Sequence, residues 1–369
     1  MKNGRPTSDL GKTGKASKFI RTVLYYIFYM DKFRVLSDLH LDINAKYPLV
    51  LDDNNVFTVI CGDTSGYPEM SIEWIKKNVK CGLCISGNHL PYCNTKDISP
   101  RDYRTMDELR KQLAEASPAN SDITYLDVEI GTFKKEVDGI LFLGSCGYSN
   151  MRISHKYWNP TGDQKKNFEC SNWNMNDYCY GKITRKWPFG IDNDPSYECM
   201  RAEDYAKWFL NAFNAFDKVL NENESRKDPL PVVLLTHFHW IPNYLTHSYY
   251  VDDAKYLYRP RDFNWASYAS DCTSWFNHHK SIKCYCVGHI HAPEKNYRHI
   301  FLDRNDGSKI LVVNNARGYV AHGHSYDWNV NTFVNTKTWD VEETPLSDAE
   351  LDIRKKDNEE RYRNLAWLF

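Results

Sequence analysis

Residues 33–40 read Phe-Arg-Val-Leu-Ser-Asp-Leu-His, a short apolar run that stops at an aspartate and a histidine. Continuous apolar runs of this length are typical of strands buried on both faces. Four more runs end in the same way, at residues 56–63 (VFTVICGD), 83–89 (LCISGNH), 232–237 (VVLLTH) and 284–291 (CYCVGHIH). Residues 71–77 have the pattern of a helix and complete a strand–helix–strand unit. The sequence therefore predicts an α/β fold built on buried strands.

The polar residues after these runs share one place in the predicted fold. In open α/β sheets, ligands bind just beyond the carboxyl ends of the strands. Polar and charged groups gathered there would repel one another or lack partners unless a ligand collects them. The residues concerned are Asp38, His40, Asp63, Asn88, His89, His237, His289 and His291.

These side chains offer the donor atoms of a site for divalent ions. Carboxylate oxygen, amide oxygen and imidazole nitrogen together suit Mn, Fe, Zn and similar metals. The set exceeds the three or four protein ligands that one ion needs, which predicts two ions that share a carboxylate. Ions about 3.5–4 Å apart can stabilise both the attacking and the leaving oxygen of an in-line displacement at phosphorus. Residues 62–63 or 87–89 alone are compatible with an ordinary turn, Asp38 and His40 alone carry little information, and residues 288–291 are moderately specific. All of the motifs in order favour the metal site.

The order of the motifs resembles that of the calcineurin-like metallophosphoesterase family, which is D-x-H, G-D, G-N-H, H and G-H-x-H. The resemblance extends from about residue 33 to about residue 319, and residues 312–319 (VVNNARGY) resemble the segment that follows the last motif. It implies two mixed β-sheets packed face to face and flanked by helices, a four-layer α/β/β/α sandwich. A dinuclear metal site would lie at one edge of this sandwich.

The resemblance also implies ligands for two divalent ions. The first ion would be held by Asp38, His40 and His291, the second by Asn88, His237 and His289, and both by the bridging Asp63. Mn is the expected metal, with Fe, Zn, Ni or Mg as alternatives. A hydroxide between the ions would attack phosphorus in line, because two divalent ions lower the pKa of water.

His89 has a different implied role, since it would face the substrate instead of a metal. It would stabilise the charge that develops on the phosphoryl group and protonate the leaving oxygen. The family commonly has an acidic residue after G-N-H, whereas this chain has Leu90. That difference leaves open how the ring of His89 is oriented and how its pKa is set.

Several other polar residues have alternative interpretations. His239 lies two residues after His237; we assign His237 to the metal because it directly follows the apolar run, and His239 becomes a candidate for the substrate pocket. Arg317 could donate hydrogen bonds to two phosphate oxygens at once or form a structural salt bridge. His278 and His279 lie in a polar stretch and are expected at the surface.

The charge balance excludes one class of function. The 369 residues contain 47 Lys and Arg against 48 Asp and Glu, a formal net charge of −1, so a broad basic face for nucleic acid is excluded.

The 11 Cys are odd in number and scattered, which favours a reduced, cytoplasmic protein over a disulfide scaffold. No apolar stretch reaches 18 residues, so no membrane span is expected.

The predicted organisation is one large domain with an insertion. Residues 31–345 would form the metallophosphoesterase domain, preceded by a disordered or misassigned leader at residues 1–30 and followed by a helical tail at residues 346–369. An aromatic-rich insertion at about residues 147–200 shows little periodicity. Its rings could stack on nucleobases or pack the insertion against the body.

Two helices outside the motifs are also predicted. Thr105 and Glu108 have the spacing of a capping box and precede apolar residues at helical intervals. Residues 203–220 carry aromatic and apolar residues on one helical stripe, as expected of a helix that faces the core.

The predicted activity is hydrolysis of a phosphate ester. A phosphodiester is favoured over a monoester, because the aromatic insertion could accept a nucleotide or a single-stranded nucleic acid. A protein phosphatase fits less well, since residues 64–67 (TSGY) follow the G-D motif without the Arg-rich segment of those relatives. A non-catalytic scaffold would lack some ligands, whereas every ligand position is filled here.

Overall fold

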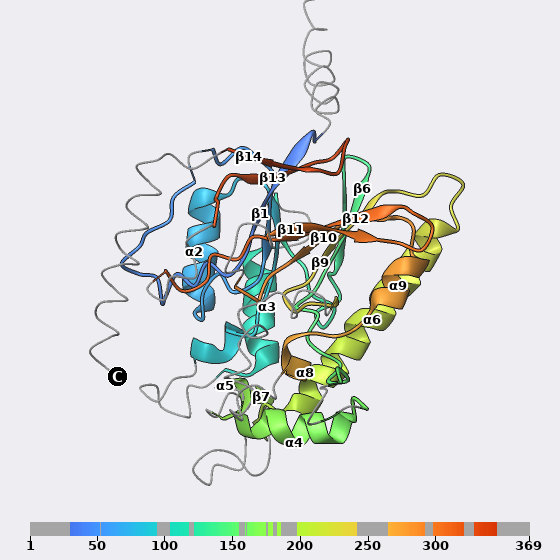
Figure 1. The fold of residues 1–369 in the computed structure, drawn as a ribbon. Coiled ribbons are helices and arrows are strands. Elements are labelled where there is room, and N and C mark those ends of the chain that lie inside the picture. Colours follow the sequence, from blue (N-terminus) through green and yellow to red (C-terminus); the bar gives the residue numbers. More distant parts are fainter. Residues whose placement is uncertain are drawn as a thin grey trace, which may run out of the picture.

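Two six-stranded mixed sheets form the body of the protein (Figure 1). The computed structural model describes residues 30–51, 53–93, 104–117, 122–154, 159, 161–174, 176–179, 183–185, 198–241, 265–291, 298–320 and 328–344. The expected tail at residues 346–369 and the expected leader, apart from Met30, lie outside these residues. Every helix among the described residues is too short or too polar to cross a lipid bilayer.

The first sheet contains the first three motif strands side by side. Its order is β14 (Val341–Glu343), β13 (Thr332–Asn335), β1 (Lys32–Leu36), β2 (Thr58–Cys61), β3 (Gly82–Ile85) and β4 (Ile123–Tyr125). Strands β1 to β4 are parallel, so the loops after β1, β2 and β3 leave the same edge. Strand β13 is antiparallel to β1, and β14 is antiparallel to β13.

The second sheet contains the other two motif strands. Its order is β11 (His299–Asp303), β12 (Lys309–Asn314), β10 (Ile282–Val287), β9 (Val232–Leu235), β6 (Ile140–Gly144) and β5 (Lys134–Val137). The inner strands β12, β10, β9 and β6 are parallel, and the edge strands β11 and β5 are antiparallel to their neighbours. All five predicted strands are therefore confirmed.

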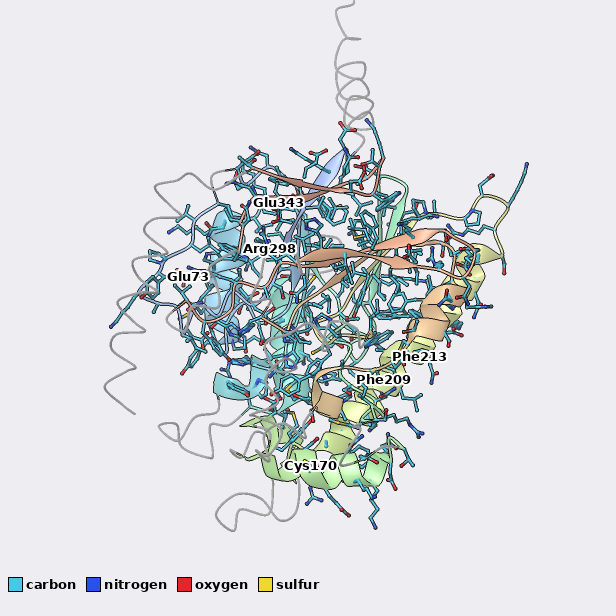
Figure 2. The ribbon with its side chains drawn as sticks, in the orientation of Figure 1. Glu73, Cys170, Phe209, Phe213, Arg298 and Glu343 are labelled. Carbon is cyan, nitrogen blue, oxygen red and sulfur yellow. The ribbon has the colours of Figure 1, made fainter. Side chains whose placement is uncertain are left out.

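The two sheets pack face to face through a buried apolar layer. Phe33 and Val35 of β1 share this layer with Phe142 of β6, Val233 of β9 and Cys284 of β10. The rings of Phe33 and Phe142 meet edge to face, with centroids 5.7 Å apart. At the rim, the Arg298 guanidinium lies 2.9 Å from a carboxylate oxygen of Glu343 on β14 (Figure 2). The predicted face-to-face packing is confirmed.

Helices cover the outer faces of both sheets. The first sheet is covered by α2 (Pro68–Asn78) and α3 (Met106–Ala116), whose Ile75 and Leu113 line a small cavity with Cys84 of β3. The second sheet is covered by α6 (Ala202–Glu224) and α9 (Thr273–His278). Phe209 and Phe213 of α6 stack on each other (Figure 2), and Phe276 of α9 contacts Tyr285 of β10.

The capping box that the sequence predicts at the start of α3 is present. Thr105 Oγ1 accepts a hydrogen bond from the Glu108 backbone N–H at 3.2 Å, and the Thr105 N–H donates to the Glu108 carboxylate at 2.7 Å. The predicted helix over residues 203–220 is α6, which buries its aromatic stripe as expected.

Helix α3 also buries a charge. The Arg110 Nε atom lies 3.4 Å from Asp127 Oδ2, and both side chains are almost fully buried. The guanidinium also lies 4.4 Å from the centroid of the Trp208 ring. We expect Arg110→Met to lower the free energy of unfolding by about 3–5 kcal/mol, because it leaves Asp127 buried without its partner.

Urea unfolding measures this effect. Lys111→Met is the matched control, since Lys111 follows Arg110 on the same helix and is exposed. Its expected change is within about 0.5 kcal/mol. Equal unfolding free energies for the two variants would contradict the structural role of Arg110.

The expectation that His279 lies at the surface is wrong, whereas His278 is exposed as expected. The His279 ring is fully buried, with Nδ1 3.0 Å from Glu224 Oε2 and Nε2 3.0 Å from Asp217 Oδ1. Two carboxylates of α6 thus satisfy the buried imidazole, and polar neighbours in the sequence do not reveal such a long-range pairing.

The insertion at residues 147–200 contains more regular structure than its sequence pattern indicates. It includes α4 (Gln164–Asn174), α5 (Asn176–Cys179) and the antiparallel strands β7 (Ile183–Arg185) and β8 (Glu198–Cys199). Two of its rings, Tyr148 and Tyr178, are buried, and both contact Tyr205 of α6. These two rings therefore pack the insertion against the body.

Candidate metal centre

Loops from both sheets meet at one site. The first sheet contributes the residues after β1, β2 and β3, and the second sheet contributes those after β9 and β10. The predicted site residues that the structure brings together here are Asp38, His40, Asp63, Asn88, His89, His237, His289 and His291.

The backbone at this site is unusual. Asp38, His40, Asp63 and His289 all have positive φ angles, of 52°, 44°, 47° and 68°. Residues other than glycine adopt this left-handed region uncommonly, and such conformations concentrate at functional sites. Four of the seven described residues other than glycine with positive φ therefore belong to the polar cluster.

The glycines of the motifs allow the loops to approach closely. A Cβ atom on Gly87 would lie 2.0 Å from Asp63 Oδ1, and one on Gly288 would lie 2.6 Å from Asp38 Oδ2. Without these side chains, the His89 N–H donates to Asp63 Oδ1 at 3.0 Å, and the His289 N–H donates to Asp38 Oδ2 at 3.0 Å. The absence of a side chain at Gly87 and Gly288 thus allows the backbone N–H groups of His89 and His289 to hold the two carboxylates in place.

One group of donor atoms lies around Asp38. Its Oδ1 atom is 3.2 Å from His291 Nε2, and His291 Nε2 is 3.1 Å from His40 Nε2. Ligand bonds of about 2.1 Å place neighbouring donors about 3.0–3.4 Å apart around one ion. The third pair, His40 Nε2 and Asp38 Oδ1, is 3.7 Å apart, so two of the three separations match the spacing around one divalent ion and the third is slightly longer.

A second group of donor atoms lies around Asn88. Its Oδ1 atom is 3.0 Å from His237 Nε2 and 3.1 Å from His289 Nδ1. Asp63 Oδ2 lies 3.2 Å from His237 Nε2 and 3.9 Å from His40 Nε2, so this carboxylate stands between the two groups. The donors around Asn88 thus also fit one ion.

The carboxylates of the site are ionised despite their burial. Burial alone would raise the pKa of Asp63, but the charges of His237 and His89 outweigh it and hold the pKa below its usual range. The pKa of Asp38 is lowered in the same way, mainly by His237. Burial would lower the pKa of His237, but Asp63 and Asp38 raise it to about 9. Ionised carboxylates are the form that binds a cation.

His89 lies beside the donors and against two tyrosines. Its Nε2 atom is 3.8 Å from Asp63 Oδ2 and 3.2 Å from the Tyr319 hydroxyl oxygen. Its ring stacks on Tyr92, with centroids 4.1 Å apart. Burial lowers the pKa of His89, although Asp63 acts in the opposite direction. Leu90, which begins the short helix η1 (Leu90–Cys93), is buried in the apolar core.

His239 and Arg317 have described contacts of other kinds. The His239 ring is fully buried, its Nε2 atom is 3.5 Å from Asn314 Nδ2, and burial lowers its pKa to about 3. Arg317 donates from Nη2 to the Tyr47 carbonyl at 2.6 Å, and its guanidinium lies over the Trp328 ring. Substrate contacts by these two residues stay predictions.

Residues that no motif predicts support the site. Tyr92 and Tyr319 contact His89, and Asp177 of α5 accepts hydrogen bonds from Asn88, Tyr92 and Tyr205. Burial raises the pKa of Asp177. Tyr319 lies in the segment that resembles the family, but Asp177 has no motif or periodicity around it.

Comparisons with known proteins show the fold. No protein-family model and no curated protein matches the chain. Phosphopantetheinyl hydrolase from Mycobacterium tuberculosis has a similar structure, with a TM-score of 0.52 and 14% identity over 86% of this chain and 96% of that one. NAD nucleotidase from Haemophilus influenzae has a TM-score of 0.30 and 9% identity, over 87% of this chain and 55% of that one. The first likeness confirms the predicted sandwich of two mixed sheets flanked by helices.

Proposed function

We propose that the protein is a metal-dependent phosphoesterase that hydrolyses a phosphodiester. The observation that carries the proposal is the pair of donor groups, one around Asp38 and one around Asn88, with Asp63 between them. Four imidazole nitrogens and two carboxylates within such short distances, all buried or nearly so, are costly to assemble unless they bind cations.

Each group would hold one divalent ion. The ligands of the first would be Asp38, His40 and His291, those of the second Asn88, His237 and His289, with Asp63 shared. When bound, such an ion pair supplies Lewis acidity toward phosphoryl oxygens and a water ionised near neutral pH. Mn is our first choice, because this mixed oxygen and nitrogen set suits it.

His89 would act on the leaving group. Its Nε2 atom faces Asp63 and the Tyr319 hydroxyl group, at the rim of the two donor groups. From that position Nε2 can pass a proton to the leaving oxygen of the ester. The stacked Tyr92 ring on one face keeps the imidazole in this orientation.

The preference for a diester rests on aromatic surface at the site. Tyr92 and Tyr319 are partly exposed and flank His89, so a nucleoside or another planar group of a diester could stack there. The buried rings of Tyr148 and Tyr178 do not offer such a surface. A nucleotide or a single-stranded nucleic acid is therefore our first substrate class.

The test is metal analysis combined with a substrate panel. We expect the purified chain to bind two Mn²⁺ ions and to hydrolyse a phosphodiester faster than a monoester. The panel includes single-stranded DNA and RNA, cyclic nucleotides and, because of the fold neighbour, a phosphopantetheinylated protein. A chelator should abolish the activity, and Mn²⁺ should restore it. A chain that binds no metal and cleaves nothing would support the scaffold alternative instead.

A further inference from the structure

We propose that Asp177 is a positioning residue that orients Asn88 toward the second metal and, through Tyr92, holds His89 in place. This proposal rests on the proposed function, since it assigns a support to the same site. It also gives the insertion at residues 147–200 a role that its sequence does not indicate.

Asp177 accepts hydrogen bonds from three residues, two in the stretch after β3 and one on α6. Asn88 donates from Nδ2 to both carboxylate oxygens, at 3.1 and 3.3 Å. Tyr92 of η1 donates to Oδ1, and Tyr205 of α6 donates to Oδ2 at 2.9 Å. The carboxyl group is almost fully buried. A buried carboxylate with this many specific donors is held in one orientation.

These contacts decide which way the Asn88 amide points. An ionised carboxylate can only accept hydrogen bonds, so the end of the amide that faces Asp177 must be the NH₂ group. The oxygen then faces the opposite side, where it lies 3.0 Å from His237 Nε2 and 3.1 Å from His289 Nδ1. Asp177 therefore presents Oδ1 of Asn88 as a metal ligand.

The same contacts strengthen that ligand. The three donors to Asp177 are an amide and two phenols. A carboxylate behind a ligating group polarises it and fixes its direction, and such support contributes about 10–100-fold to metal affinity.

Tyr92 extends the effect to His89. Its hydroxyl group donates to Asp177, while its ring stacks on the His89 imidazole. Leu90 occupies the position after G-N-H and is buried in the core, so no carboxylate from that position supports His89. We infer that Asp177, from a distant segment, supplies the support through Tyr92.

The experiment is a calorimetric titration of the metal-free full chain with Mn²⁺. We expect Asp177→Leu to weaken the binding of the second ion about 10–100-fold and to leave the first ion unaffected. Asp177→Asn should give a smaller loss, because it keeps one acceptor oxygen. Tyr178→Phe is the matched control on the same short helix, since the Tyr178 hydroxyl group has no hydrogen-bond partner among the residues that the structure describes.

A positioning role predicts weaker binding of the second ion alone. A general loosening of the structure would weaken the binding of both ions. If Asp177→Leu does not fold, as judged by circular dichroism, the isosteric Asp177→Asn decides the outcome. Unchanged affinity for both ions in the folded variant would overturn this inference and leave the proposed function intact. A wild-type chain that binds fewer than two ions would overturn both.

Discussion

Asp63→Asn should reduce phosphoester hydrolysis on the order of 10⁴-fold, as removal of one member of a cooperating catalytic unit does. The Asp63 carboxylate lies between His237 Nε2 and His40 Nε2, at 3.2 and 3.9 Å, and so between the two donor groups. Asparagine keeps the size of the side chain but removes the negative charge and leaves only one acceptor oxygen.

The measurement is kcat/KM on the best diester of the panel with saturating Mn²⁺. Glu69→Gln is the control, because Glu69 is a partly exposed carboxylate on α2 that pairs with Arg104 away from the site. Its activity should equal that of the wild type. Full activity of Asp63→Asn with a native circular dichroism spectrum would show that Asp63 does not bridge two ions.

His89→Gln should lower kcat about 10²–10⁴-fold, the range expected for the loss of a positioned proton donor. Metal content should stay unchanged, because His89 belongs to neither donor group. The loss should be larger for an ester with an alkoxide leaving group than for one with nitrophenolate, since nitrophenolate departs without a proton. His278→Gln, an exposed histidine, is the control.

Equal losses of kcat with the two leaving groups would argue against proton donation and assign His89 to charge stabilisation alone. Loss of one metal ion would instead place His89 among the ligands. The two readouts together therefore separate the three roles that an imidazole at this position could have.

The sequence was sufficient to predict the motif strands and the polar cluster. Runs such as Val232–Leu235 are apolar at every position, which indicates burial on both faces, and each ends abruptly at a polar residue. Parallel strands place their carboxyl ends at one edge, so the site followed from local information. The capping box at Thr105 is equally local, and it is confirmed.

Other features depend on contacts between distant segments. His279 looks like a surface residue until α6 brings Asp217 and Glu224 against it. Helix α4 has no continuous apolar stripe, so its sequence gives no periodic signal. Asp177 is 89 residues from Asn88 along the chain, and no pattern in one sequence marks such a pair.

The origin of the site in two separate sheets has a consequence for folding. Asp38, Asp63 and Asn88 follow strands of the first sheet, whereas His237, His289 and His291 follow strands of the second. A cation held by both sets would link the two halves of the sandwich, and it would favour the native state, because only folding brings the two sets together. By mass action, each tenfold excess of the ion over its dissociation constant then adds about 1.4 kcal/mol to the free energy of unfolding. The melting temperature measured at increasing metal concentration would therefore report metal occupancy without any substrate.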